Sequence, residues 1–236
     1  MGRIFEVRKH KMFKRFAKMS KQFARISKDV FMAVKSSGTN PANNPRLRAA
    51  LQNAKAVNMP KDRLDAAIKK ASSKDEKDLE IITYEGYGPH GIAVLVETVT
   101  DNPTRTVANV RSYFNKFNGS LGVTGSVSFM FDHKCNFRIK KTEDINPEDL
   151  ELELIDCGCE ELVVEGEEII IFGPFDAFGK LQNYFETNNM EIIESSLDRI
   201  PTMTKKLSPQ QEEDVNKLLD KMEDDEDVQD VYSTME

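Results

Sequence analysis

Residues 161–172 read ELVVEGEEIIIF, two aliphatic runs separated by Gly166. Valine and isoleucine favour strands, and a glycine between two such runs favours a tight turn, so this stretch predicts a β-hairpin. Before the hairpin, a strand is expected at 137–140, and a helix opens at Asn146-Pro147, with asparagine as the cap and proline in the first turn. After it, large apolar residues at helical spacing predict a second helix, and a last strand is expected at 191–197.

Residues 135–203 therefore predict one complete unit, whose order βαββαβ is that of ferredoxin-like folds. The elements expected before this unit are strands at 80–84, 92–98 and 126–131 and a helix at 103–117. After it, the capping box of residues 208–211 opens a helix, and a strand is expected at 228–235. Because neither flank is complete alone, residues 79–133 and 207–236 are expected to form a discontinuous ferredoxin-like domain around the insertion.

The first 77 residues predict three helices. In residues 11–35, at 100° per residue, the apolar side chains fall within an arc of about 100° and the cations fall opposite. Gly38 ends this helix, Asn44-Pro45 opens the second and Met59-Pro60 precedes the third. A polar linker follows at 72–78. The predicted fold class is α+β: a basic helical domain at 1–77, then two ferredoxin-like α+β domains, one inserted into the other.

The net charge of -7 over 236 residues is divided unevenly. Residues 1–77 hold 20 Lys and Arg against 6 Asp and Glu, whereas residues 78–236 hold 13 against 34. Between Glu6 and Asp62 the only acidic residue is Asp29. A solvated helix usually alternates acids with bases, because like charges repel. An uninterrupted basic face instead indicates contact with a polyanion, and phosphate contacts dominate non-specific affinity for nucleic acid.

We therefore predict that the basic helices bind nucleic acid. The candidate side chains are Lys9, Lys11, Lys14, Arg15, Lys18, Lys21, Arg25, Lys28, Arg46, Arg48, Lys55, Lys61, Lys69 and Lys70. A basic amphipathic helix can also lie on an anionic membrane, but here the apolar stripe continues into a domain that must bury it. Phe13 and Phe31 lie near the edge of this stripe, where core packing is favoured over stacking on bases.

Other classes of site find little support in the sequence. Three cysteines, two of them in Cys157-Gly158-Cys159, match neither zinc-ligand spacing nor a thioredoxin-like site, and they predict ordinary buried thiols in a reducing compartment. The three histidines lie in separate contexts, and no P-loop or nucleophile motif occurs. Phe129 and Phe131 share a strand face with Val127, so both are expected in the core. No metal, cofactor or catalytic residue is predicted, and the chain is not expected to be an enzyme.

Glycines at 86, 88 and 91 leave two interpretations open. Without a Cβ the backbone could approach a ligand closely, or the glycines could simply form a tight connection between strands.

Short motifs mark nearly the whole chain: NPRLRAAL at 44–51, NMPKD at 58–62, AIKK at 67–70, YEGYGP at 84–89, VLVE at 94–97, TDN at 100–102, RTVA at 105–108, GSLG at 119–122 and GSV at 125–127. Together they resemble the YebC/PmpR family. The matching loop positions supply a second set of candidate functional residues: Tyr84, Gly86, Tyr87, Gly88, Asn102 and Arg105.

The resemblance implies a three-domain fold and a probable transcriptional regulator that binds DNA. It also includes a mitochondrial translational activator of cytochrome c oxidase and bacterial relatives linked to ribosomes stalled on proline-rich sequences. No catalytic residue is attributed to the family. This chain departs from the family pattern at its start (Gly2-Arg3-Ile4-Phe5-Glu6 in place of Gly-His-Ser-Lys-Trp), at His90 in place of glycine, and at Pro103.

We accordingly predict a cytoplasmic, nucleic-acid-binding regulator of gene expression. One hypothesis is a DNA-binding transcriptional regulator, and the other is a ribosome-associated translation factor that binds ribosomal RNA or tRNA. Phosphate contacts suit both, and no helix carries an evident set of base-reading side chains. The acidic remainder of the chain would be repelled from a second nucleic-acid surface and could face protein instead. No membrane contact is predicted, and a monomer is compatible with the sequence.

Overall fold

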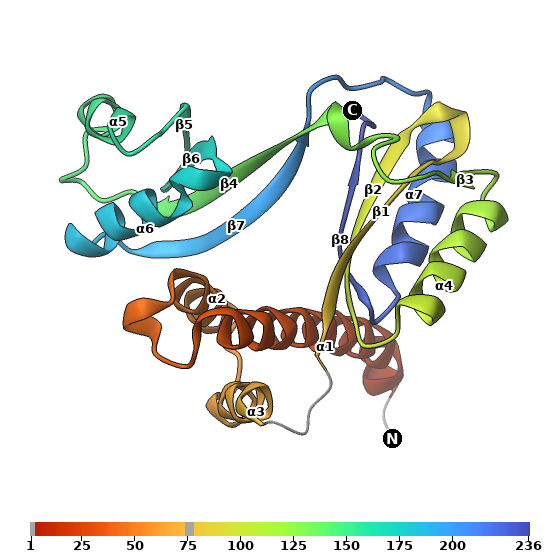
Figure 1. Ribbon diagram of the computed structural model, residues 1–236, viewed down its shortest axis with the longest axis horizontal. Coiled ribbons are helices and arrows are strands. Elements are labelled where there is room, and N and C mark those ends of the chain that lie inside the picture. The colour runs from red at the N-terminus through yellow and green to blue at the C-terminus, as the bar shows by residue number, and fades with distance from the viewer. Residues whose placement is uncertain (1–2, 74–77) are drawn as a thin grey trace. The chain divides into compact units, whose positions relative to one another are not determined.

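The computed structural model describes residues 3–73 and 78–236, with side chains from residue 19 onward (Figure 1). The chain divides into two compact units, Met1–Glu76 with Ile192–Ser195, and Lys77–Glu191 with Ser196–Glu236. Among the described residues, no helix has the length and apolar character to cross a membrane.

The first unit contains α1 (Arg3–Ser37), α2 (Pro45–Ala56) and α3 (Lys61–Ser72), as the sequence predicts. Gly38 ends α1 with a φ of 81°, a conformation that favours glycine, and its N–H donates to the carbonyl of Val34 at 2.8 Å. The predicted apolar arc of α1 packs inward. Its buried members are Phe23, Ile26, Val30, Ala33 and Val34.

Two four-stranded sheets are built from the second unit, except that Ile192–Ser195, the start of one strand, is grouped with the first unit. The strands of the first sheet have the order β3-β1-β2-β8, and their bounds are Glu80–Tyr87 for β1, Ala93–Thr100 for β2, Ser120–Leu121 for β3 and Val228–Ser233 for β8. Helices α4 (Pro103–Lys116) and α7 (Pro209–Glu223) cover one face of this sheet (Figure 1). Phe114 on α4 and Leu218 on α7 are fully buried in the core between them.

The second sheet has the order β5-β6-β4-β7. Its elements are β4 (Phe131–Lys140), α5 (Pro147–Ile155), β5 (Glu161–Glu165), β6 (Glu168–Pro174), α6 (Phe178–Thr187) and β7 (Ile192–Pro201). The predicted hairpin turns at Gly166, which has a φ of 61°. Element order and strand order both match the ferredoxin-like pattern.

The first sheet departs from the expected ferredoxin-like pattern. Its β1 and β2 are joined by the short 3₁₀ helix η2 (Pro89–Gly91), with no α-helix between them, so the order is ββαβαβ. Antiparallel neighbours need only a short connection, and the glycine-rich segment supplies one. The expected strand at its far end is confirmed, because β8 pairs with β2 in antiparallel register.

The strand expected at 126–131 was placed incorrectly, and the strand expected at 137–140 begins earlier than predicted. Residues 131–140 form one continuous strand, β4, preceded by the 3₁₀ helix η3 (Ser128–Met130). The physical reason lies in Glu85, whose carboxylate binds the backbone N–H groups of Gly125, Val127 and Ser128 at 2.8 Å each. A strand ladder would need those donors.

The same turn overturns the core assignment of Phe129. Its side chain is 74% exposed, whereas Val127 and Phe131 are buried as expected. The two-residue alternation that placed all three on one face does not hold across a 3₁₀ turn. Part of the predicted linker, residues 74–77, and the side chain of Phe13 lie outside the described residues.

Candidate nucleic-acid interface

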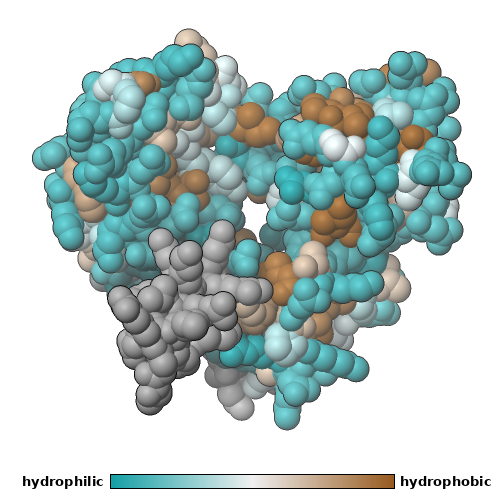
Figure 2. All heavy atoms as spheres, turned by 180° about the vertical axis from the view of Figure 1, so that it is seen from behind, coloured by the Kyte–Doolittle hydropathy of each residue, from teal (hydrophilic) through white to brown (hydrophobic). Residues whose placement is uncertain are grey.

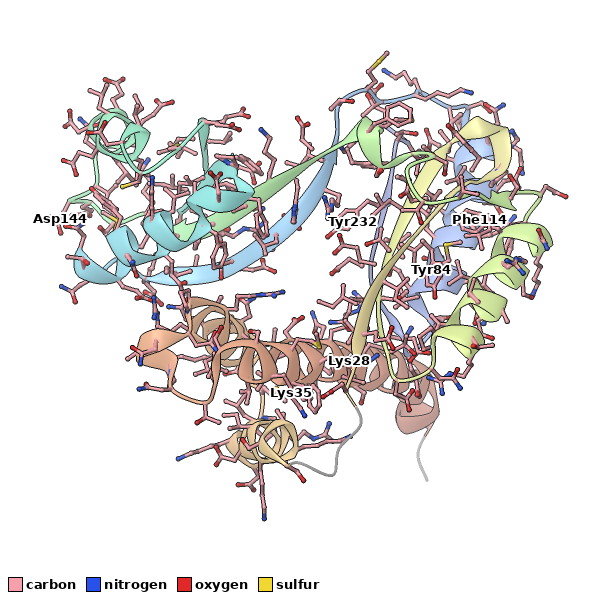
Figure 3. All side chains as sticks on the ribbon, in the orientation of Figure 1. Lys28, Lys35, Tyr84, Phe114, Asp144 and Tyr232 are labelled. Carbon is pink, nitrogen blue, oxygen red and sulfur yellow. The ribbon has the colours of Figure 1, made fainter. Side chains whose placement is uncertain are left out.

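The described part of α1 carries cations on one face. At about 100° per residue, Lys21, Arg25 and Lys28 fall within an arc of about 60°, centred opposite the buried Phe23 and Val30. Figure 3 shows Lys28 and Lys35 on this helix. Packing against α2 and α3 on one side therefore fixes which side of α1 presents its charge.

Five candidates lie earlier on α1. Their backbone is helical, but their side chains lie outside the described residues: Lys9, Lys11, Lys14, Arg15 and Lys18. The helical register places Lys14 and Lys18 within about 60° of Lys21, so their assignment to the same face stays a prediction.

Helices α2 and α3 also carry candidate cations, of which some are exposed and others contact nearby groups of the same unit. The exposed candidates on them are Arg46, Lys55, Lys61, Lys69 and Lys70. On α3 the acidic Asp62 and Asp65 are exposed as well, so its outer face carries both signs of charge. Of the two remaining arginines, Arg48 donates from Nη1 to the carbonyls of Pro41 and Ala42 at 2.8 and 3.1 Å, and Arg63 lies over the ring of Phe23. On the described part of α1 the exposed Asp29, four residues after Arg25, is the single acidic residue, whereas α3 carries two.

Asn44 connects α1 to α2 through side-chain hydrogen bonds. It is 1% exposed, and its Nδ2 donates to the carbonyls of Ala33 and Gly38 at 2.7 and 2.9 Å. Its Oδ1 accepts from the N–H of Leu47 at 3.0 Å, which caps α2. The side-chain amide of Asn44 thus makes hydrogen bonds to backbone groups at both the end of α1 and the start of α2.

The glycines of the second candidate set serve close packing inside the second unit. A Cβ at Gly86 would lie 2.5 Å from the carbonyl oxygen of Ser120, and one at Gly88 would lie 3.0 Å from Cδ2 of Leu218. These positions favour the interpretation as a tight structural element. Tyr84 and Tyr87 also make local contacts, because each hydroxyl lies 3.4 Å from a backbone carbonyl.

Asn102 and Arg105 hold the start of α4. Asn102 Oδ1 accepts from the N–H of Arg105 at 3.1 Å and caps the helix. Arg105 Nη2 lies 2.8 Å from Asp227 Oδ2, and its Nε lies 3.2 Å from the same oxygen. Hydrogen bonding to Asp227, the charge of Asp227 and contact with Asp101 together raise the pKa of Arg105. This guanidinium therefore joins α4 to the segment before β8.

Glu85 is the residue that sequence reasoning missed. It is 4% exposed and lies on β1, where a glutamate would ordinarily be assigned to the solvent face. Burial alone would raise the pKa of Glu85, but the N–H groups of Gly125, Val127 and Ser128 outweigh burial and lower it. Its partners lie some forty residues along the chain, so no local signal could reveal them.

Among the side chains that the structure describes, those of residues 19–73 and 78–236, no three His, Cys, Asp or Glu residues are grouped as metal ligands. Cys135 is buried, as predicted, and burial raises the pKa of its thiol to about 11. Cys157 and Cys159 are half-buried, so the prediction of buried thiols is met fully by Cys135 alone.

Residues 3–74 match the N-terminal domain of TACO1/YebC proteins, and residues 79–235 match the second and third domain of TACO1/YebC proteins. The chain belongs to the TACO1/YebC family.

Relatives cover the chain end to end. A probable transcriptional regulatory protein of Flavobacterium psychrophilum is 55% identical over 236 residues, with all of both chains covered. One from Flavobacterium johnsoniae is 56% identical over 235 residues, covering 100% of this chain and 99% of the relative. The crystal structure of a conserved hypothetical protein from Aquifex aeolicus superposes with a TM-score of 0.79 at 32% identity, covering 92% of this chain and 90% of that one. The names of the two Flavobacterium relatives describe probable regulators rather than enzymes.

Proposed function

We propose that the chain is a nucleic-acid-binding regulator of gene expression and grips its target through the basic face of α1. The observation that carries this proposal is the one-sided placement of Lys21, Arg25 and Lys28 opposite a buried apolar face. Cations placed on one face can contact successive phosphates, whose condensed counterions are released on binding.

We propose duplex DNA as the principal target, which agrees with the names of the relatives. The second candidate is a translation factor on ribosomal RNA or tRNA, since lysines and arginines on one face contact phosphates of either nucleic acid. Crosslinking in cells followed by sequencing of the bound DNA and RNA separates the two. Enrichment at promoters supports the first, and enrichment on ribosomal RNA supports the second and contradicts the first.

The phosphate contact predicts a specific salt dependence. Changing Lys21, Arg25 and Lys28 together to Gln should weaken duplex binding and reduce the slope of log affinity against log salt by about 2 to 3, because each neutralised phosphate contributes about 0.9. Binding is measured by fluorescence anisotropy over a salt series.

A control with the same charge change lies in the second unit, where Arg111, Lys140 and Lys180 are exposed. Their joint change to Gln should leave the salt slope as in the wild type. Equal slopes for the wild type and the α1 variant would contradict the proposed contact surface.

We further propose three functional domains, at 1–77, at 79–133 with 207–236, and at 135–203, acting in the cytoplasm without a cofactor. Only the first is basic. The acidic remainder would be repelled by phosphates over most of its surface, which suits it to protein contacts.

A further inference from the structure

Strand β5 forms one edge of the second sheet. In the strand order β5-β6-β4-β7 it pairs with β6 on one side, and in the described part of the chain no strand pairs with its other side (Figure 1). Along such an edge, alternate backbone N–H and C=O groups point away from the sheet and can pair with a further strand. The β5 edge is therefore open to strand addition.

Apolar side chains line this edge on one face of the sheet. Val164 lies opposite the fully buried Ile169 of β6, yet is itself 40% exposed. On α5, Ile155 is 56% exposed. Glu153 faces α6, because it accepts a hydrogen bond from the hydroxyl of Tyr184. Ile155, about 200° further round α5, is thus turned away from α6, on the side where α5 packs against β5.

Acidic side chains stand at both ends of the same edge. Glu161 and Glu165 are the first and last residues of β5, and both are exposed. With Val163 between them, they share the face of the sheet opposite to that of Val164, because side chains of a strand alternate. The edge therefore has an apolar centre and a negative charge at each end.

The cations nearest in the fold leave these two charges in place. Lys134 pairs with Glu160, and Arg138 pairs with Glu168. No salt bridge among the described residues includes either end residue of β5. Residues 142–179 contain no lysine or arginine, and α5 adds four acidic residues and no basic one. The surroundings of β5 are consequently negative on the side of α5 as well.

We propose that β5 is a docking edge for an extended segment of another protein, with apolar residues at its centre and lysine or arginine at its ends. The segment adds a strand beside β5, so that backbone hydrogen bonds supply affinity and alternate side chains supply specificity. Its apolar side chains lie beside Val164 and Ile155, and its cations lie opposite Glu161 and Glu165. This inference goes beyond the proposed nucleic-acid contact and does not depend on it.

A second copy of the chain does not fit this edge. Antiparallel pairing of two β5 strands, centred on Val163, would place Glu161 of each copy opposite Glu165 of the other. Like charges directly opposite each other destabilise a strand pair, whereas opposite charges stabilise it. Phosphates would meet the same repulsion. The charge at the two ends thus selects a basic segment from a different protein.

The apolar area suits a short segment rather than a folded domain. A stable interface between folded proteins takes roughly 20–30 residues from each partner. The exposed large apolar residues of α5 and β5 are Leu152, Ile155 and Val164. On the face shown in Figure 2, hydrophobic surface likewise occurs as separate patches within a hydrophilic surround.

The probe for this edge is a synthetic peptide with the central sequence Lys-Val-Thr-Val-Lys, whose alternation places both lysines on one face. Fluorescence anisotropy of the labelled peptide should show binding to the full chain, and amide hydrogen exchange should show new protection in β5. The same peptide methylated at every backbone nitrogen should not bind, because it cannot donate. A Glu-Val-Thr-Val-Glu peptide should bind about tenfold more weakly, since two attractive cross-strand pairs become repulsive.

A charge reversal tests the two end residues. Glu161→Lys combined with Glu165→Lys should reverse the preference, so that the glutamate-ended peptide binds about tenfold more tightly than the lysine-ended one. Asp220→Lys combined with Glu223→Lys is the matched control, because both residues are exposed on α7 and the change in charge is the same. The control variant should keep the preference of the wild type.

Four outcomes overturn the proposal. They are no binding of the lysine-ended peptide, equal binding of its methylated form, equal loss of binding in the two charge-reversed variants, and protection of β5 in concentrated wild type without peptide. The last would make a second copy the occupant. The nucleic-acid proposal fails separately, because it is tested by the duplex affinity of the variant changed at Lys21, Arg25 and Lys28, which retains the β5 edge.

Discussion

At the scale of single residues, Glu85 holds a backbone segment that is distant from it in sequence. Its two carboxylate oxygens accept three backbone N–H groups from the segment of residues 125–128. Hydrogen bonds to a charged acceptor are roughly twice as strong as neutral ones, and a buried carboxylate without partners would be costly. The loop before β4 therefore depends on one side chain that lies on β1.

Glu85→Gln should lower the free energy of unfolding at neutral pH by about 1–3 kcal/mol, because an amide oxygen replaces the charged acceptor. The difference from the wild type should depend on pH in a defined direction. The folded pKa of Glu85 is lowered, so its stabilisation is full above the unfolded value of about 4.3 and is lost as the pH falls through the folded pKa.

Urea unfolding of both chains at a series of pH values measures this difference. It should be constant from neutral pH down to about pH 5 and shrink at lower pH. A difference that grows on acidification would contradict the role assigned to Glu85.

Residue-scale prediction from sequence succeeds where a side chain acts locally. Asn44 and Asn146 were expected as helix caps, and they accept hydrogen bonds from the N–H groups of Leu47 and Glu148. Glu85 was missed and Phe129 was wrongly assigned to the core, because the surroundings of each depend on partners distant in sequence. A two-residue period cannot anticipate a 3₁₀ turn imposed by a carboxylate forty residues earlier.

At the scale of elements, Asn44 joins the end of α1 to the start of α2. Asn44→Ala should lower the free energy of unfolding by about 2–4 kcal/mol, since it removes a cap and one hydrogen bond to each of two carbonyls. Chemical denaturation followed by circular dichroism measures the loss.

Asn40→Ala is the matched control. Asn40 is exposed and caps only the short η1 (Pro41–Asn43), by accepting from the N–H of Ala42 at 3.0 Å. Asn40→Ala should lower the free energy of unfolding by less than about 1 kcal/mol. Equal effects at both positions would show that the two carbonyl contacts of Asn44 contribute nothing.

Helices were predicted better than strands for a physical reason. Four helices open with a polar cap followed by proline, and the bounds of α2, α4, α5 and α7 follow that signal. The short β3, with two residues, has no pattern to detect, and the start of β4 is masked by an apolar run that continues through η3. Short strands are defined by their partners rather than by their own sequence.

At the scale of the whole molecule, the second unit depends on residues distant in sequence. β2 pairs with the C-terminal β8, and Arg105 contacts Asp227. The incompleteness of each flank predicted that the C-terminal strand would join the strands of residues 79–133, but not which strand it would pair with. The two ends of the insertion lie close together, because the N–H of Thr202 donates to the carbonyl oxygen of Met130 at 2.9 Å. The sequence alone could not show this.

This closeness predicts that the insertion can be removed. Replacing residues 132–201 by a short Gly-Ser linker should leave the β1-β2-β8 sheet folded, because the core of Val96, Phe114 and Leu218 lies outside the excised segment. Amide hydrogen exchange of β2 and β8 measures whether the sheet persists.

Deletion of residues 207–236 provides the contrasting variant. It removes α7 and β8, exposes Phe114 and Val96, and should yield an aggregating chain. If the excised chain aggregates as readily, the two sheets form one indivisible domain and the proposed division is wrong.

The uneven charge has a consequence for the chain in solution. With a surplus of bases in residues 1–77 and of acids in the remainder, each molecule offers neighbours both signs of charge. At low ionic strength such molecules attract one another, and small ions weaken that attraction. Concentrated samples should therefore turn opalescent on dialysis into dilute buffer and clear again when sodium chloride is added.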